Sequence, residues 1–249
     1  MIENNYISWL ESLFQAGEKP YLQNWKSLDS LEREQAYFNA GILGAGTAMF
    51  AGAAVAVPPL GLAGSAVALA TIELSRPVDR LVSVIRQLLE EVEGVTVTPR
   101  VKTNEGIIDL LVKMPDRRCF AFALRSKGLS RVKWREEEQE FFTVTPRKGK
   151  TARVKKYADL VKSGQVLNRA TLSLKKEKNY LLGESRTERN SHIIKAIILT
   201  SKTTVDPNND PSLFVDFGLT NVLRVYAGTN IHVLEQSKII DFLAPAKRS

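Results

Sequence analysis

The residues best suited to chemistry are one carboxylate and two cations that accompany two short apolar runs. Asp109 is the only acid inside the runs Ile107–Val112 and Cys119–Leu124, and Arg125 and Lys127 follow the second run. A lone carboxylate is costly to bury unless it is paired with a cation or holds a metal. Cations close to it attract an anion such as a phosphate group. These residues therefore predict either a metal-assisted centre or an anion-binding centre.

The two apolar runs are expected to form a strand hairpin, because each is short, rich in β-forming residues and bounded by turn or charged residues. Side chains alternate along a strand, so the second run has two distinct faces. One face carries the large apolar side chains Phe120, Phe122 and Leu124. The other face carries small residues and then the two cations: Ala121, Ala123, Arg125 and Lys127. This second face has room for an anion.

A helix is predicted directly before these strands, over residues 77–93. Ser75 and Pro77 mark its start and Gly94 marks its end. Its apolar residues follow the spacing of one helix face: Val78, Leu81, Val82, Ile85, Leu88, Leu89 and Val92. Residues 95–97 then predict a first strand, so the order here is one helix and three strands.

This arrangement resembles the PD-(D/E)XK phosphodiesterase superfamily, which has the restriction-endonuclease-like fold and includes the nuclease-related domain. The family pattern is a strand carrying an Asp, a turn, and a second strand that ends in an acid, any residue and a Lys. Asp109 and Lys127 match this pattern, whereas Arg125 stands where the motif acid is expected. By the order of its elements, the resemblance covers roughly residues 77–243.

The resemblance implies metal-dependent phosphodiester cleavage, in which carboxylates hold Mg²⁺ and a Lys steadies the developing charge. Asp109 and Lys127 would take two of these roles, and Glu90 or Glu91 on the preceding helix could complete the metal site. Other candidates apply if the acid has moved to a helix after the second strand: Glu136, Glu137 and Glu140. A guanidinium at Arg125 would repel Mg²⁺, and it would bind a phosphate or pair with Asp109. We therefore expect weak or absent cleavage.

The net charge of +8 is unevenly distributed along the chain. Residues 1–75 carry 3 Lys/Arg and 7 Asp/Glu, so residues 76–249 carry 32 against 20. Residues 125–189 alone hold 18 Lys/Arg against 8 Asp/Glu, more than solubility requires. A basic region of this kind predicts a polyanionic partner, either nucleic acid or an anionic membrane surface, although charge runs are also common on solvated surfaces. The predicted nucleic-acid contacts are Arg147, Lys148, Lys150, Arg153, Lys155 and Lys156.

A long uncharged stretch occupies 33 residues, from Ala40 to Ile72. Pro58, Pro59 and Gly61 should interrupt it, which predicts an Ala/Gly-rich hairpin of two helices over residues 40–72. The first arm approaches the length needed to cross a bilayer core of roughly 30 Å. Two interpretations remain open: a hairpin inserted in a membrane with both ends on the cytoplasmic side, or a soluble hairpin buried in an oligomer.

The remaining segments complete an α+β prediction. Residues 2–16 predict a helix with one apolar face, and a capping box at Asp29 and Glu32 predicts a second helix starting near Ser30. A further helix is expected over residues 154–161 and a surface loop over residues 205–212. Later strands are expected over residues 192–201 and 222–226, and a strand and helix over residues 231–243.

The predicted organisation is a helical region, residues 1–75, followed by a basic nuclease-like α/β domain, residues 76–249. The single cysteine, Cys119, excludes an intrachain disulfide and fits a reducing compartment such as the cytoplasm. The predicted function is a membrane-associated, nuclease-like protein that binds nucleic acid through its basic surface. The alternative is a catalytically dead nuclease fold that serves as a scaffold for a protein partner, another copy of the chain or a membrane.

Overall fold

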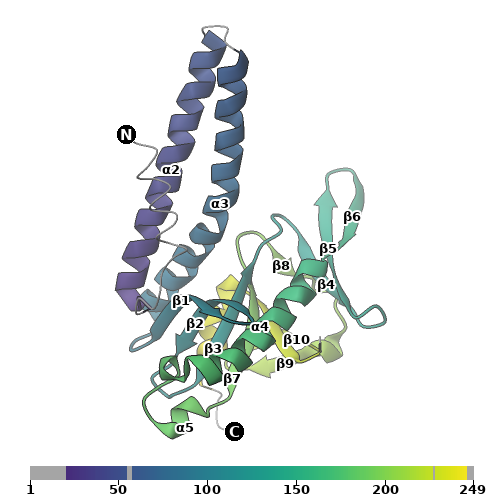
Figure 1. The fold of residues 1–249 in the computed structure, drawn as a ribbon. Coiled ribbons are helices and arrows are strands. Elements are labelled where there is room, and N and C mark those ends of the chain that lie inside the picture. Colours follow the sequence, from purple (N-terminus) through teal and green to yellow (C-terminus); the bar gives the residue numbers. More distant parts are fainter. Residues whose placement is uncertain (1–20, 55–57, 227, 246–249) are drawn as a thin grey trace.

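The computed structural model describes residues 21–54, 58–226 and 228–245, and the side chains of residues 45–54 and 58–74 lie outside that description. The described part is an α+β protein, in which two long helices precede a mixed sheet (Figure 1). The helix predicted over residues 2–16 lies outside the described residues.

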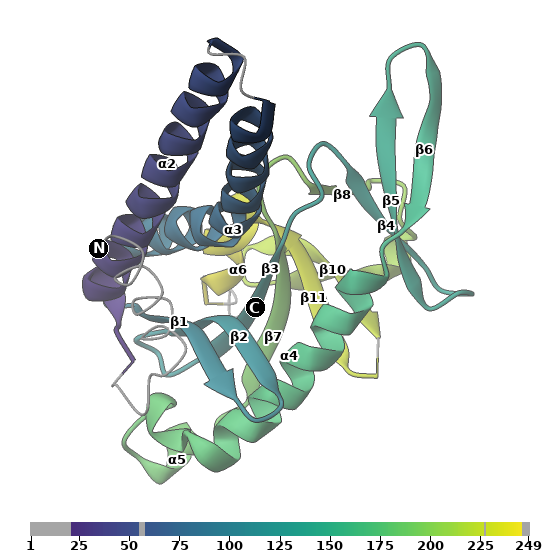
Figure 2. The same cartoon turned by 45° about the horizontal axis from the view of Figure 1, so that its top comes forward.

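The two long helices, α2 (Asn24–Ala54) and α3 (Pro58–Glu91), lie side by side (Figures 1 and 2). The predicted start near Ser30 is wrong, because α2 begins at Asn24. The backbone of Asn24 has a φ of +52°, and its side-chain oxygen accepts a hydrogen bond of 2.9 Å from the Val97 amide. The start of α2 is thus set by the contact with Val97 rather than by the capping box at Asp29 and Glu32.

The uncharged stretch over residues 40–72 falls on both helices. Most of the side chains of this stretch lie outside the described part. No helix in the described residues contains a segment long and apolar enough to cross a membrane.

Helix α3 continues through Pro77, where a new helix was expected to start. A proline inside a helix removes one backbone hydrogen bond and clashes with the preceding turn, so it bends the helix. Figure 2 shows α3 changing direction along its length. The predicted apolar face is confirmed beyond this point, since these side chains are buried: Val78, Leu81, Val82, Ile85 and Leu88.

The main sheet of the described part has seven strands in the order β1-β2-β3-β7-β11-β10-β9. The predicted antiparallel hairpin is confirmed as β2 and β3, and β3 then pairs in parallel with β7, which pairs in parallel with β11. The strands are β1 Thr96–Thr103, β2 Gly106–Lys113, β3 Cys119–Arg125, β7 Ile193–Leu199, β9 Phe214–Phe217, β10 Thr220–Tyr226 and β11 Asn230–Glu235.

Helices cover both faces of this sheet. On one face α2, α3 and the short α6 (Ile239–Leu243) share a core with Phe120, Phe122 and Leu124. On the other face α4 (Ala158–Glu177) shares a second core with Ala121 and Ala123. The predicted two faces of β3 are therefore confirmed.

A smaller sheet follows β3 and has the order β6-β5-β4-β8 within the described residues. Its strands are β4 Arg131–Arg135, β5 Glu140–Arg147, β6 Lys150–Lys156 and β8 Thr204–Val205. The helix predicted over residues 154–161 is confirmed only from Ala158, where α4 begins, and its predicted start is wrong because β6 runs to Lys156. The helix considered for Glu136, Glu137 and Glu140 is also wrong, since these residues lie in the β4–β5 turn and at the start of β5.

Trp134 and Phe141 connect the smaller sheet to the core. Their rings pack edge to face with centroids 4.7 Å apart, and both residues belong to the core that α4 shares.

The segment 205–212 is only partly the surface loop that was expected. Asp206 and Asn209 are buried, with 4% and 3% of their surface exposed. The Asn209 side chain accepts a hydrogen bond of 2.7 Å from the Trp134 amide and donates one of 3.2 Å to the Val132 carbonyl. The loop thus fixes β4 in place through buried polar contacts.

Short helical segments complete the described chain: α5 Arg186–Arg189, η1 Asn179–Leu181, η2 Pro211–Leu213 and η3 Gln236–Lys238.

Cys119 provides a test of the packing between β3 and α4. The residue is 1% exposed, and burial raises the pKa of its thiol to about 12. Because the thiolate is the reactive form, we expect no reaction with a disulfide reagent such as DTNB in native buffer at pH 8, and full reaction in denaturant. Fast modification of the native protein, followed by thionitrobenzoate absorbance, would contradict the buried placement.

Candidate anion-binding site

Asp109 and Arg125 meet on neighbouring strands of the main sheet. Asp109 lies in β2 and Arg125 ends β3, and the Arg125 Nη1 is 2.6 Å from the Asp109 Oδ2. The same oxygen accepts a hydrogen bond of 2.8 Å from the Leu124 amide. Charge-assisted contacts of this length are strong, so the carboxylate is neutralised by the residue that stands at the expected position of the motif acid.

The Arg125 guanidinium is also held from the side of α4. Its Nε donates a hydrogen bond of 2.6 Å to the Ser163 Oγ, which in turn donates to the Asp159 carbonyl at 2.6 Å. Its Nη1 contacts the Leu124 carbonyl at 2.7 Å. The side chains of Asp109 and Arg125 keep 27% and 29% of their surface exposed. Arg125 is thus fixed in orientation and still accessible to a ligand.

Lys127 lies beyond the end of β3 and faces an aromatic ring rather than Asp109. Its amide donates a hydrogen bond of 2.7 Å to the Thr203 Oγ1. Its Nζ lies 5.1 Å from the centroid of the Tyr157 ring, which is the geometry of a cation–π contact. The structure therefore brings Lys127 to the same region as Arg125, since both act on Tyr157.

Tyr157 is a member of this site that the sequence did not indicate. The residue is 4% exposed, and within the described part of the chain its hydroxyl makes no hydrogen bond. Burial raises the pKa of the phenol, and the nearby Arg125 and Arg80 oppose that shift. The hydroxyl therefore stays protonated at neutral pH and is available to donate a hydrogen bond to an anion.

Arg80 reaches the same region from α3 and was also not predicted as a site residue. Burial lowers the pKa of its guanidinium, and the groups that act on it electrostatically include Tyr157, Arg125 and Asp109. Arg80 forms no ion pair or hydrogen bond with the described residues. A half-buried cation that has no ion-pair or hydrogen-bond partner among the described residues has unused capacity for an anionic ligand. No local pattern marks Arg80, because it lies far from Arg125 in the sequence.

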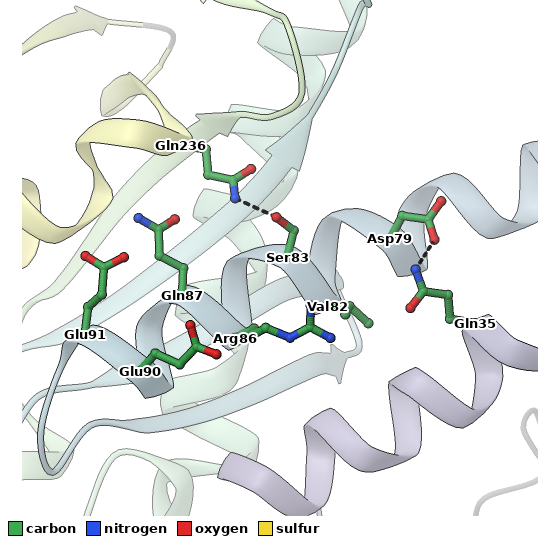
Figure 3. A pocket seen from close by; sticks show the side chains of 9 residues that line it. All are labelled: Gln35, Asp79, Val82, Ser83, Arg86, Gln87, Glu90, Glu91 and Gln236. Atoms are coloured by element: carbon green, nitrogen blue, oxygen red, sulfur yellow. Dashed lines mark hydrogen bonds between the residues drawn. The ribbon is translucent and has the colours of Figure 1, made fainter.

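The predicted metal ligands do not come together. Glu90 and Glu91 line a groove of about 420 Å³ beside α3, which Asp109 does not line (Figure 3). The other lining residues are Gln35, Asp79, Val82, Ser83, Arg86, Gln87 and Gln236. Among the residues that the structure describes, no three His, Cys, Asp or Glu side chains form a group that could hold a metal. The set of Asp109, Glu90 and Glu91 therefore does not form a metal centre.

The predicted nucleic-acid contacts all lie on one hairpin, which we call the basic arm (residues 147–156). Every residue of the basic arm is exposed. Figures 1 and 2 show that the β5–β6 hairpin projects from the rest of the protein. Lys156 forms an ion pair with Glu140, and the other predicted cations have no carboxylate partner in the described part: Arg147, Lys148, Lys150, Arg153 and Lys155.

Relatives of known function provide no guide to this site. Comparisons of the chain with protein-family models, with curated proteins and with solved structures find no match. The α+β fold and the cationic site between α3, the end of β3 and Tyr157 are therefore the features that bear on function.

Proposed function

We propose that this protein binds nucleic acid through its phosphate groups and does not cleave it, using a degenerate PD-(D/E)XK-like core. The order α3, β1, β2, β3, α4 and β7 supports this proposal, because a helix and three strands open the core of that superfamily. Asp109 in β2 and Lys127 after β3 occupy the matching positions.

The observation that carries the proposal is the contact of 2.6 Å between Arg125 and Asp109. Where the family pattern has two carboxylates, this chain has an acid and a cation whose charges cancel. Arg80 and Lys127 then give the region a net positive charge. Guanidinium groups bind phosphate oxygens through directed, charge-assisted hydrogen bonds. The Tyr157 hydroxyl, which is not among the buried unpaired polar atoms of the described residues, adds a neutral donor. This donor set suits a phosphodiester group better than it suits Mg²⁺.

The test is a binding and cleavage assay with labelled single- and double-stranded nucleic acid at low salt, with and without Mg²⁺. We expect salt-sensitive binding and no cleavage. Arg80→Gln should weaken binding about tenfold, the typical value of one hydrogen bond from a charged group. Arg33→Gln, an equal charge change on the exposed side of α2, should leave the affinity unchanged.

Two results would contradict the proposal. Mg²⁺-dependent cleavage that disappears in Lys127→Ala would establish a nuclease. Absence of binding to any nucleic acid at low salt would favour the scaffold alternative, in which the basic surface meets a protein or an anionic membrane.

The variant Asp109→Asn distinguishes between two interpretations of this region, an anion-binding site and a metal site. Loss of the carboxylate charge leaves Arg125 free to bind phosphate, so we expect affinity for nucleic acid to rise severalfold. Because the pair is partly exposed, its loss should lower the free energy of unfolding by only about 1 kcal/mol. Fluorescence anisotropy and urea denaturation measure the two effects. A fall in affinity that depends on Mg²⁺ would indicate that Asp109 serves a metal.

A further inference from the structure

The basic arm is an antiparallel ribbon whose cations are sorted between its faces. Thr145 pairs with Arg153 and Thr143 pairs with Lys155, and a register shift follows before Arg147 pairs with Lys150. Paired residues share a face, as do alternate residues of one strand. We define the cationic face of the arm as the side carrying Arg147, Lys150, Arg153 and Lys155.

The cationic face is continuous with the anion-binding site. By alternation Tyr157, the next residue after β6, falls on the same face as Arg153 and Lys155. The Tyr157 amide donates a hydrogen bond of 2.6 Å to the Phe141 carbonyl, which attaches this corner to β5. Tyr157 also contacts Lys127. Positive groups therefore follow one another from the core to the tip of the arm.

The base of the arm is held rigidly against the core. Trp134 and Phe141 are buried on the same side of the smaller sheet as the cationic face, but closer to the core. The Ser130 and Thr145 hydroxyls form a hydrogen bond of 2.8 Å, and Asn209 fixes the backbone of β4. A ligand on the cationic face would therefore meet a preorganised surface, which reduces the entropy lost on binding.

The composition of the arm indicates which nucleic acid it fits. Residues 143–156 contain no aromatic and no acidic side chain. Proteins that bind single strands rely on aromatic side chains on which the bases stack, and the arm offers none. Its donors can instead contact phosphates, which position a duplex without reading its sequence. The arm therefore favours a duplex over a single strand.

The shape of the arm distinguishes the two kinds of duplex. The major groove of B-form DNA, about 12 Å wide, admits a two-stranded β-ribbon. The major groove of A-form RNA is deep and too narrow for side chains to read. Resting on the proposed function, we propose that the arm inserts its cationic face into the major groove of double-stranded DNA. The DNA backbone then continues towards Arg125 and Lys127.

The test compares the affinity of the full chain for duplex DNA, for single-stranded DNA of the same length and for the matching duplex RNA at one salt concentration. We expect duplex DNA to bind about tenfold more tightly than either competitor, within the range of preference that groove contacts provide. Equal affinity for all three would overturn this inference and leave the proposed function standing. Absence of binding to all three would overturn both.

Two variants with equal charge change decide whether the cationic face is responsible. R147Q/K150Q/R153Q/K155Q neutralises the cationic face. R33Q/R131Q/K133Q/R135Q neutralises Arg33 on the exposed side of α2 and three cations of β4, which the pairing of β4 and β5 places on the opposite face of the same sheet. The first variant should abolish the preference for duplex DNA and the second should retain it. Equal losses in both variants would show that only net charge matters and would overturn the inference.

Discussion

The variant R147Q/K150Q/R153Q/K155Q is expected to bind duplex DNA about 100-fold more weakly than the natural chain at low salt, because four phosphate contacts and their counterion release are lost. These side chains are exposed and have no carboxylate partner in the described part of the chain, so their removal leaves no buried group unpaired. The thermal unfolding temperature should therefore remain close to that of the natural protein. The loss of affinity is then a loss of contacts rather than of fold.

Salt titration measures this effect independently of the absolute affinity. The logarithm of the binding constant falls linearly with the logarithm of the salt concentration, and each phosphate contact contributes a slope of about 0.9. The variant should show a slope that is smaller by about 3 to 4. R33Q/R131Q/K133Q/R135Q is the matched control and should retain the slope of the natural chain. An unchanged slope in the first variant would mean that the arm does not contact phosphates.

Phe242→Ala is expected to cause the largest loss of stability, about 3–5 kcal/mol in the free energy of unfolding, as for other buried aromatic residues. Phe242 is fully buried in α6. Its ring lies 4.5 Å from the Phe217 centroid, 5.7 Å from the Phe120 centroid and 6.3 Å from the Phe122 centroid. Truncation leaves a cavity and removes contacts from both β3 and β9, and the surrounding strands can collapse only partly.

Urea denaturation followed by circular dichroism measures this loss. Phe242→Leu is the control, because it retains most of the apolar volume, and its cost should be well below that of Phe242→Ala. At temperatures where Phe242→Ala remains folded, its affinity for DNA should be unchanged, since α6 lies on the face of the sheet opposite α4. A loss below about 1 kcal/mol would contradict the central position of Phe242 in this core.

Contacts between distant residues decided several features that no local pattern contained. Asn24, where α2 starts, accepts a hydrogen bond from Val97, and α3 continues through Pro77. Residues 154–156 form a strand because β6 pairs with β5, although their composition also suits a helix. The meeting of Arg80, Tyr157 and Arg125 likewise depends on how α3 and α4 pack on the sheet. Sequence separation hides the contact of Asn24 with Val97 and the meeting of Arg80 with Tyr157 and Arg125.

The sequence by itself determined the features that depend on local periodicity and on residue type. Alternation along β3 separated Phe120 and Phe122 from Ala121 and Ala123, and the spacing of apolar residues located the buried face of α3. The resemblance to the PD-(D/E)XK pattern predicted that Arg125 stands where an acid is expected. Only the tertiary structure decided that Arg125 pairs with Asp109, that Glu90 and Glu91 line a different groove, and that four of the arm cations share one face. Periodicity specifies which side of an element is buried, whereas packing specifies which elements meet.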